Sequence, residues 1–307
     1  MKISTSLFFD RSTQQLSNVQ AKLTKVQEQL STGLQIVKPS DEPDKASLVT
    51  RLESELSRQA GYQDTLKAVN VRLTAEETAL KNTSDVMYRI KELSVQAAND
   101  TFGTQDRQSI ALELTTLRDQ ILSMANSQDS NGNYLFSGSR AGEPAFNKDS
   151  SGRVTYQGDH SRMKVNVGDN RRMNLNMPGS DAFTRVVRDD GKGGKVGVDF
   201  FQALDDIVQA VKSEDRTKIQ RGIAEVDTLQ NGVSEALGQI GADLSVVDMQ
   251  NNVLDQVVLR LKTTRSDIED LDYTEAITRM NKDQLALEAA QSSFSKISQM
   301  SLFKYLA

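Results

Sequence analysis

The sequence predicts a mostly α protein with a small β insert: elongated, with terminal coiled-coil helices, a long helical bundle domain and an inserted antiparallel β domain. The positions of proline and glycine in the 307 residues support this class. No proline occurs between Pro43 and Pro144 or after Pro178, so two long stretches permit uninterrupted helices. Of the 18 glycines, 11 lie between Gly132 and Gly197, which indicates turns and short strands in that span.

The N-terminal stretch predicts a coiled-coil helix. Its apolar residues recur in steps of three and four, the spacing of a coiled-coil seam. These residues are Leu16, Val19, Leu23, Val26 and Leu30. Gly33 is placed to end the helix, and Pro43 is suited to the first turn of the next one, which is expected to run to about Asn99. A third amphipathic helix is expected between Ile110 and Met124.

The chain after residue 199 repeats the helical pattern. Apolar residues from Phe200 to Val211 predict a short helix, and a longer pattern restarts near Ser213 and continues towards the C-terminus. Glycines within it weaken the helix by up to about 1 kcal/mol each and mark either close packing or a bend. They are Gly222, Gly232, Gly238 and Gly241. The last segment carries a second seam, formed by Ile277, Met280, Leu287, Phe294 and Ile297.

The middle of the chain changes to the alternating pattern of β-strands. Residues 163–167 and 173–177 alternate apolar and polar side chains around a Gly-Asp-Asn turn, which predicts a hairpin with one buried face. Strands are also expected at Val154–Tyr156 and near Val186. The segment from Asp190 through the following glycines is expected to be a flexible loop.

The composition excludes several classes of function. The chain has no cysteine, one histidine and a net charge of −5, which argues against thiol chemistry, zinc binding and a basic nucleic-acid surface. His160 is expected to be a solvated turn residue, and the acidic residues 267–272 a solvated helix face with no metal. The glycines of residues 191–197 lack the spacing of a nucleotide-binding loop. We therefore expect no catalytic residue, cofactor, metal or membrane span.

Both terminal seams require a partner, because a single helix of this length rarely folds alone in water. The other terminus is the obvious candidate, and an antiparallel pairing would bring both chain ends together. Periodicity alone leaves two interpretations equally weighted: an intramolecular coiled coil, or an interface for assembly. From Tyr273 onward charged residues are sparse and Ser, Gln and Ala are frequent, which favours several neighbouring chains.

Three motifs resemble the family of flagellin and the flagellar hook-associated proteins. Residues 27–48, QEQLSTGLQIVKPSDEPDKASL, are similar to the signature in which a heptad helix ends at Ser-x-Gly and an acidic, proline-containing break follows. Residues 131–146, NGNYLFSGSRAGEPAF, resemble the passage from the helical domain to the outer one. The ending SSFSKISQMSLFKYLA is similar to the family's C-terminus. Within the family, SDEPD, SLFKYL and the small insert resemble the hook–filament junction proteins more than flagellin.

The resemblance implies an arrangement of three parts. Residues 1–42 and 273–307 would form an inner tube of terminal coiled-coil helices. Residues 43–130 and 199–272 would form a helical rod domain, and residues 131–198 an outer β-rich insert. The two seams would then be an assembly interface rather than an intramolecular coiled coil.

The resemblance also implies a structural role in the bacterial flagellum. The chain would form a ring-like layer of copies of itself between hook-associated protein 1 and the flagellin filament, and its termini would fold as they assemble. It would be secreted through the flagellar type III export apparatus without a cleaved signal peptide. An export chaperone would hold the C-terminal segment, with Phe294, Ile297, Leu302 and Phe303 as its contacts.

Two other interpretations belong beside this one. Flagellin itself, the filament subunit, is the nearest competitor because its terminal helices share the same pattern. A coiled-coil effector or translocator of a type III secretion system is the second, and it predicts binding to a membrane or a host protein.

Overall fold

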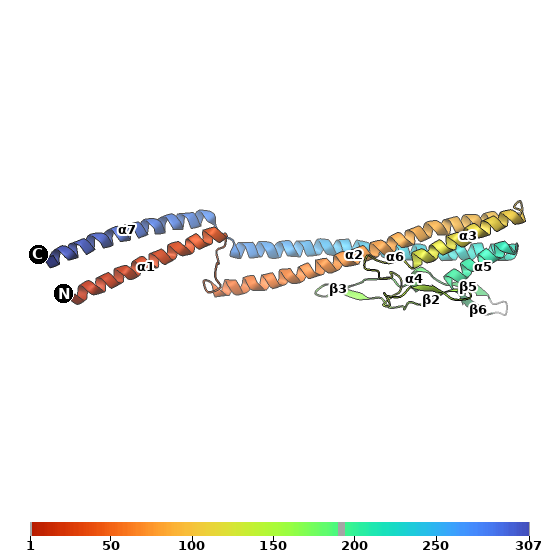
Figure 1. The fold of residues 1–307 in the computed structure, drawn as a ribbon, viewed down its shortest axis with the longest axis horizontal. Coiled ribbons are helices and arrows are strands. Elements are labelled where there is room, and N and C mark those ends of the chain that lie inside the picture. Colours follow the sequence, from red (N-terminus) through yellow and green to blue (C-terminus); the bar gives the residue numbers. More distant parts are fainter. Residues whose placement is uncertain (1, 190–193, 307) are drawn as a thin grey trace. The chain divides into compact units, whose positions relative to one another are not determined.

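The computed structural model describes residues 2–189 and 194–306 and consists mainly of helices (Figure 1). The helices are α1 (Lys2–Thr32), α2 (Pro43–Ala97), α3 (Thr104–Ala125), α4 (Gly179–Ala182), α5 (Phe200–Lys212), α6 (Arg216–Glu269) and α7 (Tyr273–Leu306). The strands are β1 (Phe146–Lys148), β2 (Val154–Tyr156), β3 (Lys164–Gly168), β4 (Arg171–Asn174), β5 (Val186–Asp189) and β6 (Lys195–Val198). The predicted class, helical with a small antiparallel insert, is confirmed.

Helix boundaries follow the expected local signals. Gly33 has a φ of +73°, a left-handed conformation that most residues avoid, and it directly follows the end of α1. Pro43 is the first residue of α2, where its missing N–H costs nothing. At α3, the carboxylate of Asp106 accepts the backbone N–H of Gly103 (3.1 Å). The long pattern near the C-terminus divides into α6 and α7 at residues 270–272.

The insert contains three separate antiparallel strand pairs among the described residues, β1–β2, β3–β4 and β5–β6. The predicted hairpin is β3–β4, in which Val165 pairs with Met173 and the register shifts before Gly168. The expected strands at Val154–Tyr156 and near Val186 are β2 and β5. Most of the predicted loop, residues 190–193, lies outside the described residues, and β6 begins just after it at Lys195.

The chain divides into two compact units, each with its own apolar cluster. The central unit, Ala60–Asp255, holds a core that runs from Leu66 to Leu254 and joins α2, α3, α5, α6 and the insert. The terminal unit comprises Met1–Gln59 and Gln256–Ala307 and has a small cluster centred on Val26. The boundaries between the units fall inside α2 and α6.

Aromatic side chains link the insert to α5 within the central unit. Phe183, which follows α4, lies 5.2 Å from the rings of both Phe146 and Phe200 in edge-to-face contacts. Phe201 lies 5.1 Å from Phe146 and 6.2 Å from Phe183. These rings are nearly fully buried, and such edge-to-face pairs add to the gain from burial.

Candidate assembly interface

The α1 and α7 helices pack against each other as an antiparallel pair, with both chain ends at the same end of the pair (Figure 1). Near the termini, the rings of Phe9 and Phe294 meet edge to face at 5.5 Å. At the opposite end of the pair, Val26 packs with Leu271 and Ala276 in one buried cluster. The expected pairing of the two chain ends is therefore confirmed within this chain.

Backbone hydrogen bonds join the two connections at the base of this pair. The N–H of Gln35 donates to the carbonyl oxygen of Glu269 (2.7 Å), and the N–H of Leu271 donates to that of Gly33 (3.0 Å). Leu34 and Asp270 form an isolated antiparallel bridge between them. The break after α1 and the break before α7 thus lie side by side, and each satisfies the other's backbone groups.

Asp272 caps the start of α7. Its carboxylate accepts the N–H groups of Thr274 (2.9 Å) and Glu275 (3.1 Å), as an N-terminal helix cap does. With α7 starting there, Ala276 is fully buried in the cluster with Val26. Ile277, one residue further round the helix, is 45% exposed and lies outside that cluster.

Among the predicted seam residues whose side chains the structure describes, only one is buried. Val26 is 6% exposed and buried. Those with intermediate burial are Leu16, Val19, Leu23, Leu30, Met280, Leu287 and Phe294. The side chains of Ile297, Leu302 and Phe303 lie outside the described part of the structure. Two helices therefore leave most of the seam partly in contact with water.

Sequence reasoning missed three residues of this pair. Phe9 extends the α1 seam by one heptad before Leu16, so the spacing alone contained that signal. Gln29 is 5% exposed and its Nε2 donates to the carbonyl oxygen of Gln35 (2.5 Å), which no apolar periodicity reveals. Ala276 was overlooked beside the larger Ile277.

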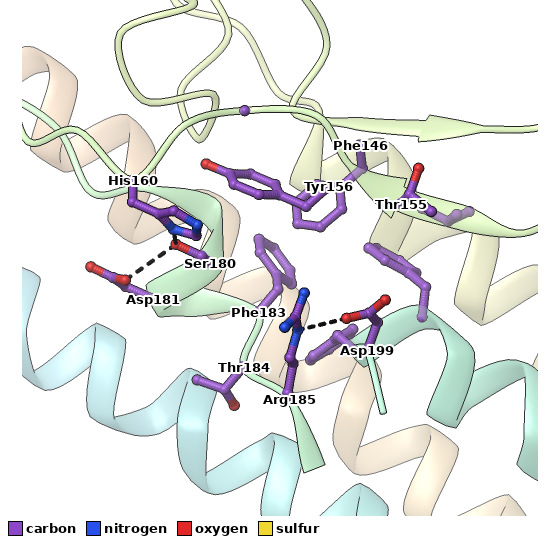
Figure 2. Close-up of a pocket in the computed structure, with 14 residues that line it drawn as sticks. Phe146, Thr155, Tyr156, His160, Ser180, Asp181, Phe183, Thr184, Arg185 and Asp199 are labelled. Atoms are coloured by element: carbon purple, nitrogen blue, oxygen red, sulfur yellow. Dashed lines mark hydrogen bonds and ion pairs between the residues drawn. The ribbon is translucent and has the colours of Figure 1, made fainter. Parts of the chain in front are cut away.

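A cavity of about 710 Å³ lies in the central unit between β2, α4 and the start of α5 (Figure 2). Its walls combine buried phenylalanine rings with a polar rim that includes His160, Ser180 and Asp199. The Nδ1 of His160 is 2.7 Å from the Ser180 hydroxyl, and the Asp199 carboxylate pairs with Arg185 at 2.7 Å.

Tyr156 is a half-buried wall residue of this cavity, and its hydroxyl forms hydrogen bonds with the backbone. Its hydroxyl donates to the carbonyl oxygen of Asp159 (2.7 Å), and burial raises the pKa of Tyr156 to about 12. The imidazole of His160 is exposed, and its ring lies 5.9 Å from that of Tyr156 in a tilted arrangement. These contacts tie the turn at residues 158–160 to the strand beside it.

The acidic residues near the end of α6 have structural partners. Glu269 pairs with Arg265 (3.4 Å), Asp270 accepts the Ser266 hydroxyl, and Asp272 caps α7. Across residues 2–189 and 194–306, no group of three or more His, Cys, Asp or Glu side chains is arranged to hold a metal ion. Within the same residues, no helix is both long enough and apolar enough to cross a bilayer.

Comparison with protein families accounts for both ends of the chain. The bacterial flagellin N-terminal helical region matches residues 3–141, and the C-terminal helical region matches residues 223–306. Together they cover more than two thirds of the sequence. The chain belongs to the flagellin family. The N-terminal match contains α1, α2 and α3, and the C-terminal match contains α7 and most of α6.

Among curated members of the flagellin family, the chain is 26% identical to flagellar hook-associated protein 3 of Salmonella typhimurium, over 99% of each chain. The Escherichia coli protein of the same name matches equally, again over 99% of each. A flagellin of Listeria monocytogenes is 22% identical over 97% of this chain and 96% of its own.

Solved structures of the flagellin family share this fold. A putative flagellar hook-associated protein from Vibrio parahaemolyticus is 25% identical, with a TM-score of 0.67 over 75% of this chain and all of the other. Flagellar hook-associated protein 3 of Legionella pneumophila, at 15% identity, has a TM-score of 0.65 over 72% of this chain and 98% of its own. Flagellin-family proteins are structural components of the flagellum.

Proposed function

We propose that this chain is the junction subunit of a bacterial flagellum, forming a layer between hook-associated protein 1 and the flagellin filament. The observation that carries the proposal is the match to flagellar hook-associated protein 3 over 99% of both chains. The identity of 26% to these two proteins also exceeds the 22% shared with a flagellin of Listeria monocytogenes over 97% of this chain.

The proposed mechanism is coupled folding and assembly. Leu16, Val19, Leu23 and Leu30 are only partly buried, and Ile277 is 45% exposed. Completing the burial of such a side chain stabilises by up to about 1.5–3 kcal/mol, so contact with neighbouring copies would add to stability at each seam position. In this proposal the seams form the assembly interface, through which neighbouring copies contact each other in a ring-like layer.

The proposal also covers the export route of the chain and the location of its three parts in the assembled flagellum. We infer that the chain leaves the cell through the flagellar type III apparatus, with an export chaperone on Phe294, Ile297, Leu302 and Phe303. Residues 1–42 and 273–307 would line the inner tube, residues 43–130 and 199–272 the rod, and residues 131–198 the outer surface. The sparse charge of the last segment supports its place among several neighbours.

Flagellin is the alternative, since a flagellin of Listeria monocytogenes also aligns over 97% of this chain. Polymerisation of the purified chain, seeded with short filament fragments, separates the two roles when growth is followed by electron microscopy. A junction subunit adds at most a thin terminal layer. Growth of long filaments from this chain alone would establish it as a filament subunit. Imaging of the labelled chain in intact flagella provides a second test. A junction subunit should lie at the hook–filament boundary, and a filament subunit should lie along the filament.

A further inference from the structure

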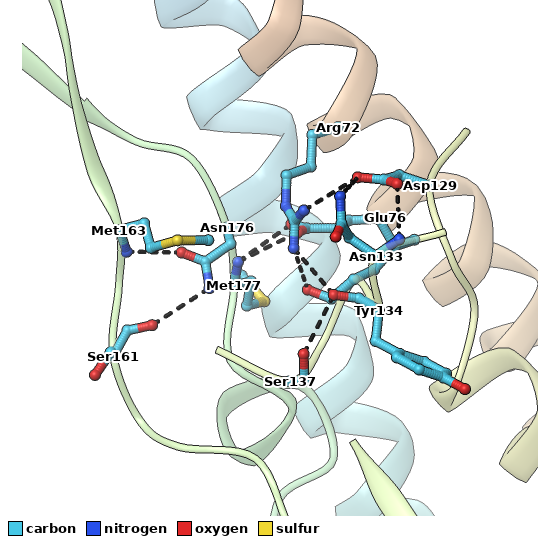
Figure 3. Close-up of polar contacts among 11 residues, drawn as sticks. Arg72, Glu76, Asp129, Asn133, Tyr134, Ser137, Ser161, Met163, Asn176 and Met177 are labelled. Carbon is cyan, nitrogen blue, oxygen red and sulfur yellow. Dashed lines mark hydrogen bonds and ion pairs between the residues drawn. The ribbon is translucent and has the colours of Figure 1, made fainter. Parts of the chain in front are cut away.

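A buried Arg–Glu pair lies on α2 in the central unit, where the chain enters and leaves the insert (Figure 3). Arg72 and Glu76 are one helical turn apart, with Nε and Oε1 separated by 3.4 Å. Their side chains are 8% and 0% exposed. A charged pair so completely removed from water is costly unless each group has further partners.

Those partners come from the two segments that connect the insert to the helices. The outgoing segment is held by Arg72, whose Nη2 donates to the carbonyl oxygens of Tyr134 (3.2 Å) and Leu135 (2.9 Å). The returning segment is held by Glu76, whose two carboxylate oxygens lie 3.3 and 3.4 Å from the N–H of Met177. One turn of α2 therefore forms hydrogen bonds with both segments.

The charges around this turn do not balance. Among the described side chains, Arg72 is the cation paired with Glu76 on its own helix and with Asp129 of the outgoing segment, at 3.5 Å from Nη1. Asp243 of α6 adds further negative charge towards Glu76. If all three carboxyl groups were ionised, one guanidinium would have to offset three negative charges.

The proton needed for balance belongs on Glu76. Burial opposes the ionisation of Asp129, but the N–H groups of Asn133 and Asn131 outweigh it and lower the pKa of Asp129. Burial raises the pKa of Glu76 from 4.5 to about 8, an effect that Arg72 and the N–H of Met177 reduce but do not cancel.

We propose that Arg72 and Glu76 form a proton-dependent clamp that holds both segments of the insert on α2 and releases the returning segment in alkaline solution. With Glu76 protonated, its carboxyl still accepts the Met177 N–H, while Arg72 remains paired with Asp129. When Glu76 ionises, it requires water that the closed site excludes. The segment at Met177 then moves away so that the carboxylate can be hydrated.

The direction of the pH effect follows from linkage. The folded chain holds a proton on Glu76 that the unfolded chain releases above its ordinary pKa of 4.5. The free energy of unfolding is therefore highest, as far as Glu76 affects it, below pH 4.5. It falls as the pH rises from 4.5 to about 8 and no longer changes through Glu76 above that pH. Over that interval, Glu76 increases the unfolding equilibrium constant by up to about tenfold per pH unit.

Denaturant unfolding of the full-length chain and of Glu76→Gln, measured from pH 5 to pH 9, tests the clamp. Glutamine keeps an acceptor for the Met177 N–H and has no ionisation. We expect the variant to unfold with nearly the wild-type constant at pH 5 and with a constant at least tenfold smaller than wild type at pH 9. The matched control, Glu77→Gln, changes the adjacent half-buried carboxylate and should retain the wild-type pH dependence. A Glu76→Gln chain that is destabilised equally at every pH overturns the proposal.

Hydrogen exchange in the wild-type chain tests the release itself and needs no variant. After correction for the intrinsic pH dependence of exchange, the amide of Met177 should lose at least tenfold protection between pH 6 and pH 9. The amide of Val26, in the terminal unit, serves as the reference and should lose less, because its local opening does not expose Glu76. Equal changes at Met177 and Val26, or no change at Met177, would mean that ionisation does not open the clamp.

Discussion

At the scale of single residues, two loops of the insert region share one construction. Asp129 accepts the N–H groups of Asn131 and Asn133, and Asp149 likewise accepts those of Ser151 and Arg153. In both loops the fourth residue is a glycine, Gly132 or Gly152, with φ values of +81° and +87°. Asp-Ser-x-Gly is thus a turn that occurs twice in this chain, and its glycine is required by the left-handed backbone.

Alanine at either glycine should destabilise the chain by about 1–2 kcal/mol, because a side chain in the left-handed region meets its own backbone. No atom lies within 4 Å of a Cβ built at Gly132, so backbone strain alone would act there. Gly142→Ala is the matched control, with equal space and no positive φ, and should be neutral. Urea unfolding of the variants gives the comparison, and equal stability of Gly132→Ala and Gly142→Ala would contradict it.

At the scale of elements, the glycines of α6 separate into two kinds. Gly222 faces α5, where a Cβ would lie 2.8 Å from the side chain of Ile207, so close packing of two helices explains it. Gly232 similarly lies against Thr184. No atom lies within 4 Å of a Cβ at Gly238 or Gly241. Close packing, one of the two expected explanations, holds for the first pair only.

Opposite effects are therefore expected from the same substitution within one helix. Gly238→Ala should stabilise by up to about 1 kcal/mol, through helix propensity alone. Gly222→Ala should destabilise by about 1–2 kcal/mol, because displacement of Ile207 outweighs that gain. Thermal unfolding of both variants measures the difference, and a stabilising Gly222→Ala would show that α5 and α6 can separate without cost.

At the scale of the whole molecule, the proposed role depends on the seam of the α1–α7 pair. Leu23→Asp or Phe294→Asp places a charge on the seam and should abolish junction assembly while the central unit stays folded. Leu112→Asp, at a position 70% exposed on α3, is the control and should assemble normally. Motility of complemented cells and circular dichroism of the purified chains provide the two measurements. Normal filament growth with Leu23→Asp would contradict the role of the seam.

Much of the fold follows from local patterns in the sequence. The end of α1 at Gly33, the start of α2 at Pro43 and the β3–β4 hairpin depend on residues within a few positions of each other. Periodicity likewise located the seams. It placed Ile277 beside Met280, whereas in the structure Ala276 packs with Val26. A pattern spaced by three and four tolerates such a shift of one residue.

The sequence by itself determined the helical class, the position of the insert and the two apolar seams, since proline, glycine and heptad spacing act over short distances along the chain. Only the tertiary structure decided which groups are buried together. In the sequence, Arg72 and Glu76 resemble an ordinary surface pair one helical turn apart. In the structure, the segment at Met177, 101 positions after Glu76, covers this pair. Removal of water by distant segments changes the proton affinity of such a pair, and no local pattern records it.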